Sequence, residues 1–107
     1  MIKSFGNKIA QDLYNDKRSK ALSKFPSELL RVARRKILYI HDADQLIDLK
    51  VPPGNRLEAL KGDLKGKYSL DLEHPFRLII EPIFNDENKE LQNVISVNII
   101  KMEDYHG

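Results

Sequence analysis

The sequence contains no cysteine, so nothing in it points to a disulfide scaffold, a thiolate metal site or a thiol nucleophile. It also lacks long apolar runs. The N-terminal residues MIKSFGNK do not resemble a secretion signal, and no stretch approaches the roughly 20 apolar residues of a membrane span. The three histidines, at positions 41, 74 and 106, do not have the spacing of metal ligands. We therefore expect a cytoplasmic protein with no membrane anchor, metal ion or cofactor.

The 107 residues leave room for one domain, residues 1–107, because a chain of this length buries only about two-thirds of its extended surface. The formal net charge of +2 is unevenly distributed. Residues 1–36 hold ten Lys or Arg and three Asp or Glu, residues 37–70 hold five of each, and residues 71–107 hold three and eight. The basic N-terminal third indicates a face that meets phosphates or an acidic protein partner, with an ordinary solvated surface as the alternative.

Hydropathy patterns predict a strand and two helices in the N-terminal half. Residues 1–5 alternate apolar and polar side chains, as a short half-buried strand does. A one-sided apolar stripe predicts a first helix over residues 8–14. Pro26 opens a longer helix that continues to about residue 41, with apolar residues at the helical period. Its outward face is expected to be strongly basic.

The period changes from 3.6 to 2 in the C-terminal half. Residues 65–72 and 76–84 predict a hairpin around a turn at residues 73–75, a polar run over residues 85–92 predicts the next turn, and residues 94–103 predict a last strand. The order of elements indicates an α+β domain. We expect the N-terminal strand and two helices to accompany a mostly antiparallel sheet that a three-strand meander completes, with both helices on one face.

Three segments carry a resemblance to a known family. The first is PPGNRLEALKGD, residues 52–63, with KGKYSL after it. The second is the aromatic-arginine-aliphatic run of residues 76–79, and the third is EDYH, residues 103–106. In this order, and on this succession of elements, the chain resembles the HigB-type branch of the RelE/ParE superfamily of bacterial toxins from its first strand to His106.

The resemblance implies a RelE-like fold and the toxin of a type II toxin-antitoxin system. Such a toxin is a ribosome-dependent mRNA endonuclease, an mRNA interferase that cuts messenger RNA in the ribosomal A site. The implied partners are the ribosome, messenger RNA and a cognate HigA-like antitoxin, a helix-turn-helix protein that holds the toxin inactive. Two alternatives are a ParE-like gyrase inhibitor without RNase activity and a catalytically inactive module that regulates its own operon. The intact pair of Asp104 and His106 disfavours both.

Cutting RNA without a metal requires the 2′-hydroxyl to attack the neighbouring phosphate, which needs a base, cations for the phosphorane and an acid for the leaving 5′-oxygen. The predicted catalytic residues are Asp104, Tyr105, His106, Arg77 and Lys61. His106 has the side chain best suited to move protons at neutral pH, and Asp104 sets its tautomer or shares the work. Strand alternation places Asp104 and His106 on one face. Tyr105 joins them only through a bend in the backbone, or else it stacks on a base.

Several of these positions have alternative interpretations. Arg77 offers a planar fork to phosphate oxygens or pairs with Glu81 on the same strand face. Lys61 adds a point charge or is an exposed loop lysine. Glu58 stands where some family members carry a histidine, so it is either a carboxylate base or inert. The acidic run of residues 71–74 is expected to lie away from the RNA.

Other cations are candidates for contact with RNA or the ribosome, namely Arg31, Arg34, Arg35, Lys36, Lys65 and Lys67. For the helical cations, a solvated face and a surface that meets an acidic antitoxin are the alternatives. His41 is expected to interact with the last carbonyls of its helix, and His74 to be turn surface.

Overall fold

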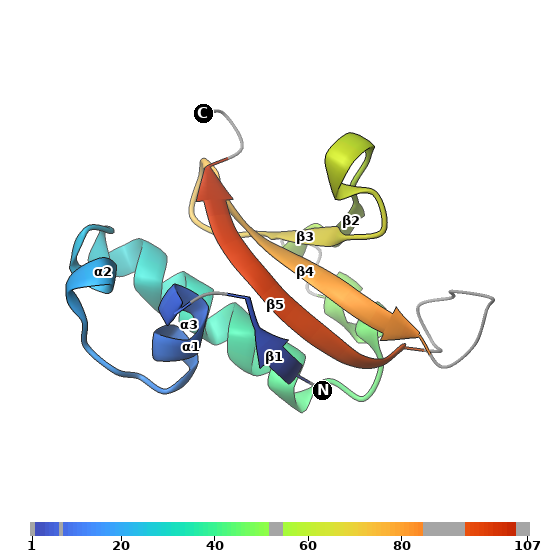
Figure 1. Cartoon of the computed structure of the whole chain (residues 1–107), viewed down its shortest axis with the longest axis horizontal. Coiled ribbons are helices and arrows are strands. Elements are labelled where there is room, and N and C mark those ends of the chain that lie inside the picture. Colours follow the sequence, from blue (N-terminus) through green and yellow to red (C-terminus); the bar gives the residue numbers. More distant parts are fainter. Residues whose placement is uncertain (1, 7, 52–54, 85–93, 105–107) are drawn as a thin grey trace.

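In a computed structural model the chain forms a five-stranded sheet with its helices on one face (Figure 1). The structure describes residues 2–6, 8–51, 55–84 and 94–104, apart from the side chains of residues 84, 94–101, 103 and 104. The strands are β1 (Ile2–Phe5), β2 (Glu58–Ala59), β3 (Tyr68–Asp71), β4 (Phe76–Phe84) and β5 (Val94–Asp104). Their order in the sheet is β1-β5-β4-β3-β2. β1 runs parallel to β5, and every other neighbouring pair is antiparallel.

This architecture confirms the expected α+β fold with its three-strand meander of β3, β4 and β5. The turn at residues 73–75 is present between β3 and β4, as expected. The turn predicted over residues 85–92 lies outside the described residues. The two-residue strand β2 was not predicted, because an element this short has no period of its own and forms only by pairing with β3.

The helices are α1 (Lys8–Tyr14), α2 (Lys20–Ser23) and α3 (Ser27–Asp42), with 3₁₀ turns η1 (Leu46–Lys50) and η3 (Gly62–Leu64). α1 and α3 confirm the two predicted helices. The short α2 was not predicted. It begins where the Ser19 hydroxyl accepts a hydrogen bond from the backbone N–H of Leu22 at 3.3 Å, a typical N-cap. None of the helices in the described part of the chain is long and apolar enough to span a membrane.

The core lies between α1, α3 and η1 on one side and the inner face of β3 and β4 on the other. Ile37 and Ile40 of α3 meet Leu70, Leu78 and Ile80 of the sheet, and all five are at most 1% exposed. Burial of each such side chain contributes roughly 1.5–3 kcal/mol relative to its exposure. Because one face of the sheet is used in this way, residues at alternate positions of β3 and β4 point to the opposite face.

Candidate active site

A small cavity of about 220 Å³ opens on the face of the sheet opposite the helical core. Cα pairing joins Glu58 of β2 to Ser69 of β3, and Asp71 of β3 to Arg77 of β4. Directly paired residues project from the same face of a sheet, and so do residues two apart on one strand. These four side chains therefore share a face, and they line the cavity together with Arg56.

Arg56 enters the cavity from an unusual backbone conformation. Its φ of 45° lies in the left-handed region, which a non-glycine residue adopts only when its surroundings hold it there. The preceding residue, Asn55, is only 1% exposed, and its Nδ2 donates to the carbonyl oxygens of Leu49 at 3.1 Å and Val51 at 3.5 Å. The buried amide thus ties Asn55 to the end of η1 and fixes the position from which Arg56 projects.

The cavity brings two arginines together with two carboxylates. Arg56 Nη1 lies 3.4 Å from Asp71 Oδ2, and Arg56 Nη2 lies 3.8 Å from Glu58 Oε2. Both ion pairs are partly solvated, so each contributes little to stability and is exchangeable. An anion that enters the cavity would compete with Asp71 and Glu58 for the guanidinium group of Arg56. The arrangement suits the binding of a phosphate oxygen.

Among the predicted catalytic residues, Arg77 lies near the beginning of β4 and lines the cavity. Its Cα partner on β5 is Glu103, and the partner of the preceding residue, Phe76, is Asp104. Asp104 is therefore one register step from Arg77, at the last residue of β5. Tyr105 and His106 lie outside the described residues, so their predicted roles stay predictions.

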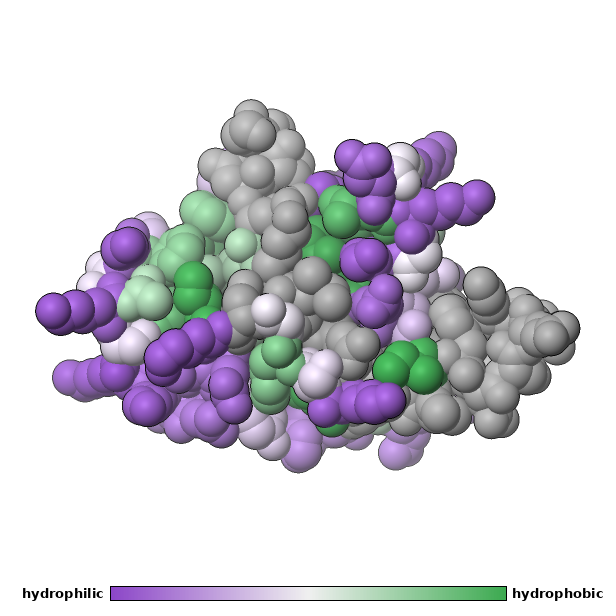
Figure 2. All heavy atoms as spheres, in the orientation of Figure 1, coloured by the Kyte–Doolittle hydropathy of each residue, from purple (hydrophilic) through white to green (hydrophobic). Residues whose placement is uncertain are grey.

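The predicted cations of the β2–β3 connection lie on the surface. Lys61 and Lys65 flank η3 and are exposed, and Figure 2 shows hydrophilic side chains projecting from this region. Lys67 is half-buried, and its Nζ lies 3.7 Å from Glu81 Oε2. Glu81, the alternative partner considered for Arg77, is thus an ion-pair partner of Lys67.

The predicted cationic cluster of α3 divides into two sets. Arg31, Arg34 and Arg35 line a groove between α3 and the α1–α2 segment, which is separate from the Arg77 cavity. Lys36 is only 7% exposed, so the prediction that it belongs to the outward basic face is wrong. Burial and the neighbouring charge of Arg35 lower the pKa of Lys36, while Asp71 acts in the opposite direction.

The two histidines outside the C-terminal segment, His41 and His74, lie at the end of α3 and in the turn between β3 and β4. His41 lies in the last turn of α3, as the capping interpretation requires, and its Nδ1 is 3.3 Å from the hydroxyl of Tyr14. Their rings are 5.4 Å apart. His74 is exposed in the turn between β3 and β4, which confirms its assignment to turn surface.

Sequence reasoning missed Arg56, Ser69 and Asp71 as members of one cavity. The alternation of apolar and polar residues over positions 67–72 could have indicated two of them, because it places Ser69 and Asp71 together on the polar face of the hairpin. Asp71 had instead been assigned to an acidic run away from the RNA, whereas it lies opposite Arg77 in the sheet. Arg56 stands within the family-like segment of residues 52–63, but nothing in that segment gave it a role, since only the folded backbone directs it toward the sheet.

Comparisons with known proteins agree with this fold. The family model described as the RelE-like toxin of type II toxin-antitoxin system HigB matches residues 3–97. The match ends before Asp104, so it does not include the C-terminal candidate residues. Toxin HigB-1 of Vibrio cholerae serotype O1 is 35% identical over 81 residues, which cover 76% of this chain and 83% of that protein. An uncharacterized protein of Haemophilus influenzae is 36% identical over 72 residues, which are 67% of each chain. The chain belongs to the family of RelE-like HigB toxins of type II toxin-antitoxin systems.

Proposed function

We propose that this toxin is a metal-independent endoribonuclease that cuts messenger RNA on the ribosome and is inhibited by a cognate HigA-like antitoxin. The cavity lined by Arg56 and Arg77 is the observation that supports the proposal best. Two guanidinium groups in one cavity suit a phosphodiester, because each presents a planar fork of donors to phosphate oxygens. The end of β5, which carries Asp104, lies one register step away.

In the proposed reaction the 2′-oxygen attacks phosphorus while a base accepts its proton, and the bond to the 5′-oxygen breaks as an acid protonates it. The products are a 2′,3′-cyclic phosphate and a 5′-hydroxyl. His106 moves protons in this scheme, and Asp104 orients its imidazole or shares the transfer. Tyr105 holds the substrate base or completes the site.

Arg77 and Arg56 stabilise the additional negative charge of the phosphorane. A fixed donor directed at charge that develops in the transition state typically contributes roughly 10²–10³-fold in rate. Lys61, on the exposed connection after β2, adds a point charge along the path of the RNA. Glu58 and Asp71 hold the Arg56 side chain in place until the phosphate replaces them.

The RNA must also be held outside the cavity. Lys65 and Lys67 extend the positive charge from the β2–β3 connection, and Arg31, Arg34 and Arg35 provide further cations on α3. Contacts of this kind fix the position of the backbone without reading the sequence. We assign them to ribosomal RNA and messenger RNA in the proposed complex.

The test is to induce the chain in bacteria and map 5′ ends of messenger RNA recovered from translating ribosomes. New ends are expected with the unaltered chain. Arg77→Ala, Arg56→Ala and His106→Ala should each lower the yield of ends by at least about tenfold, because each removes a group from the transition-state site. Lys50→Ala, at an exposed position of η1 away from the cavity, is the control and should leave the yield unchanged.

The same cultures separate the alternative functions. Growth arrest with altered DNA supercoiling and no new RNA ends would show a gyrase inhibitor. No arrest and no new ends would favour a module that acts only through its antitoxin. Cleavage by the Arg77→Ala and Arg56→Ala variants at the level of the unaltered chain would remove the cavity from the mechanism.

A further inference from the structure

A groove of about 690 Å³ lies between α3 and the segment that runs from the end of α1 through α2. It is larger than the Arg77 cavity and shares no residue with it. Its volume lies within the roughly 300–1,000 Å³ of typical ligand sites. The proposed cleavage takes place on the opposite face of the sheet, so the scissile phosphate does not account for this groove.

The floor of the groove is apolar. Leu13 of α1 and Leu22 of α2 are buried at its base, and Leu30 and Leu38 of α3 are half-buried along its length. Figure 2 shows apolar atoms at the α2 end of the molecule, among hydrophilic ones. Exposed leucine surface in a hollow favours a flat apolar ligand face, because contact removes both surfaces from water.

The rim of the groove is cationic. Five Lys or Arg side chains line it against two carboxylates. Both carboxylates are already paired, since Asp12 lies 3.2 Å from Lys8 Nζ and Asp16 lies 3.7 Å from Arg34 Nε. Among the residues that the structure describes, Arg18 forms no ion pair with a carboxylate. The rim therefore has positive charge that the described part of the chain does not neutralise.

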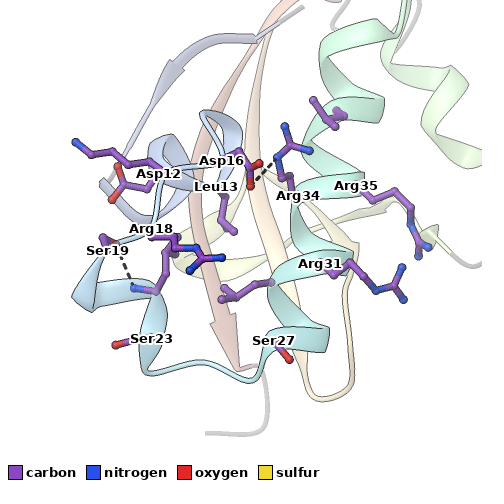
Figure 3. A pocket seen from close by; sticks show the side chains of 14 residues that line it. Asp12, Leu13, Asp16, Arg18, Ser19, Ser23, Ser27, Arg31, Arg34 and Arg35 are labelled. Atoms are coloured by element: carbon purple, nitrogen blue, oxygen red, sulfur yellow. Dashed lines mark hydrogen bonds and ion pairs between the residues drawn. The ribbon is translucent and has the colours of Figure 1, made fainter.

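The arginines of the rim point in two directions (Figure 3). The exposed side chain of Arg18 extends from the α1–α2 wall toward α3. Those of Arg31 and Arg35 extend from α3 away from that wall. One guanidinium group thus lies at the mouth of the apolar hollow, and the cationic surface continues from the groove across α3.

We propose that this groove holds one unstacked base of ribosomal RNA, an inference that rests on the proposed action of the toxin on the ribosome. The base lies on the floor at Leu30 and Leu38, beneath the guanidinium plane of Arg18. The phosphates on either side of it meet Arg31 and Arg35, where the RNA backbone crosses α3. Guanidinium planes and apolar side chains both serve as contact surfaces for bases that have left a stack.

The apolar floor distinguishes a base from a backbone. Phosphates alone would leave the floor unused, because an apolar surface offers nothing to a charged group. Messenger RNA is the less suitable source of the base, since its scissile phosphate is assigned to Arg56 and Arg77 on the other face of the sheet. Structured RNA presents unstacked bases in its loops and bulges, and these are the parts of RNA that proteins recognise through base contacts.

The test measures binding of purified toxin to a fluorescently labelled RNA hairpin that carries one bulged adenosine. Every ribose is 2′-O-methylated, so the hairpin has no 2′-hydroxyl and the proposed reaction cannot cleave it. A second hairpin with an abasic residue at the bulge has the same charge. It should bind at least about fivefold more weakly, because only the stacked base is missing. A methylated single strand with and without one abasic residue is measured in parallel.

Substitutions in the protein separate stacking from charge. Arg18→Lys keeps the positive charge but removes the guanidinium plane, so it should abolish most of the difference between the two hairpins. Arg18→Ala should do the same. Lys50→Ala also removes one charge, at an exposed position outside the groove, and should leave the difference unchanged within about twofold. Circular dichroism melts establish that the variants are folded.

Several outcomes would overturn the proposal. Equal binding of the bulged and abasic hairpins would show a surface that holds phosphates only. A full base effect in Arg18→Lys would remove the guanidinium plane from the site. A base effect in the single strand but not in the hairpin would assign the groove to messenger RNA. Displacement of a bound acidic peptide, without any base effect, would assign it to a protein partner.

Failure of this proposal is distinguishable from failure of the proposed nuclease function. The hairpin assay measures binding and involves no cleavage, whereas the nuclease is tested by new 5′ ends of messenger RNA. A base effect that depends on Arg18, in a chain that produces no new ends, would leave the base site in place and remove the nuclease. New ends together with equal binding of the two hairpins would do the reverse.

Discussion

The buried amide of Asn55 links the stability of the protein to its candidate active site. It donates to two backbone carbonyls and precedes Arg56, whose backbone is left-handed. We expect Asn55→Ala to lower the free energy of unfolding by about 1–3 kcal/mol, because the buried carbonyl of Leu49 and the partly buried carbonyl of Val51 lose their donor. Urea denaturation measures the effect. Asn15→Ala, in an exposed turn, should change it by less than about 0.5 kcal/mol.

The Asn55→Ala variant should also lower RNA cleavage, because the backbone that positions Arg56 is no longer held by the Asn55 hydrogen bonds. Cleavage should be measured well below the melting temperature of the variant, where the protein is folded, so that a lower rate reflects the position of Arg56 and not unfolding. An unchanged urea midpoint would mean that the hydrogen bonds of the Asn55 amide do not contribute to stability.

Asp12 is a buried carboxylate, with its side chain only 4% exposed. Burial by itself raises the pKa of Asp12, but hydrogen bonds from Lys8 and Ser19 and the charges of Lys8 and Lys17 outweigh it and lower the pKa below 3.8. A carboxyl group with a lowered pKa in the folded state stabilises the protein above its unfolded pKa. This stabilisation is lost as the pH falls through the folded value.

We therefore expect Asp12→Asn to lower the melting temperature at neutral pH, with a difference from the unaltered chain that shrinks as the pH falls below about 4. Thermal melts across this range measure it. Asp44→Asn, at an exposed position, serves as the control and should show no such convergence. A constant difference at every pH would contradict the assigned role of the Asp12 charge.

At the scale of the element, α3 shows how one helix serves two surfaces. Its buried positions include 29, 33, 36 and 40, which follow the same three- and four-residue spacing. Lys36 lies in this buried stripe. Its position could have been read from the sequence, because it has the same spacing as the apolar residues of the helix. The sequence-based interpretation grouped Lys36 with its basic neighbours in the chain, whereas residues adjacent in a helix point in different directions.

The burial of Lys36 predicts a stabilising substitution. Because its pKa is lowered on folding, the unfolded chain binds the proton more tightly, and stability increases as the pH rises from the folded pKa toward 10.5. Lys36→Met keeps the buried aliphatic length and removes the charge, so it should raise the melting temperature at neutral pH and abolish this increase. Lys24→Met, which is exposed, is the matched control. A lower melting temperature for Lys36→Met would show that the ammonium group has compensating partners.

At the scale of the whole molecule, the parallel pair of β1 and β5 joins the two ends of the described chain. Phe5 pairs with Ile99 across the sheet and lies 5.4 Å, between ring centroids, from Tyr14 of α1. Phe5→Ala should lower the free energy of unfolding by roughly 1–3 kcal/mol, less than for a fully buried phenylalanine because this ring is half-buried.

Lys3→Ala, on the same strand but exposed, should stay within about 0.5 kcal/mol. Because β1 contributes to both the sheet and the α1 contact, fluorescence and circular dichroism should report one transition for Phe5→Ala. Two separate transitions would show that β1 detaches independently of the core.

The uneven charge of the chain also has a spatial meaning. The basic N-terminal third contributes the rim of the groove between α2 and α3, and Arg77, from the acidic third, lies in the separate cavity on the other face of the sheet. The two hollows thus lie apart and share no lining residue. The position of each was not apparent from the charge count, which records order along the chain and not direction in space.

The sequence by itself determined the elements that have a period of their own. Residues 8–14, 27–42, 68–71, 76–84 and 94–104 form the helices and strands that their hydropathy predicts, because a repeating apolar stripe must be buried in any compact fold. Arg77 was likewise identified within its strand. Only the tertiary structure decided the pairing of β1 with β5, the addition of β2 to the sheet edge, and the meeting of Arg56 with Asp71 and Glu58. No local sequence pattern relates the residues that meet in these contacts. Their relative positions are set only when the helices and strands pack around the core.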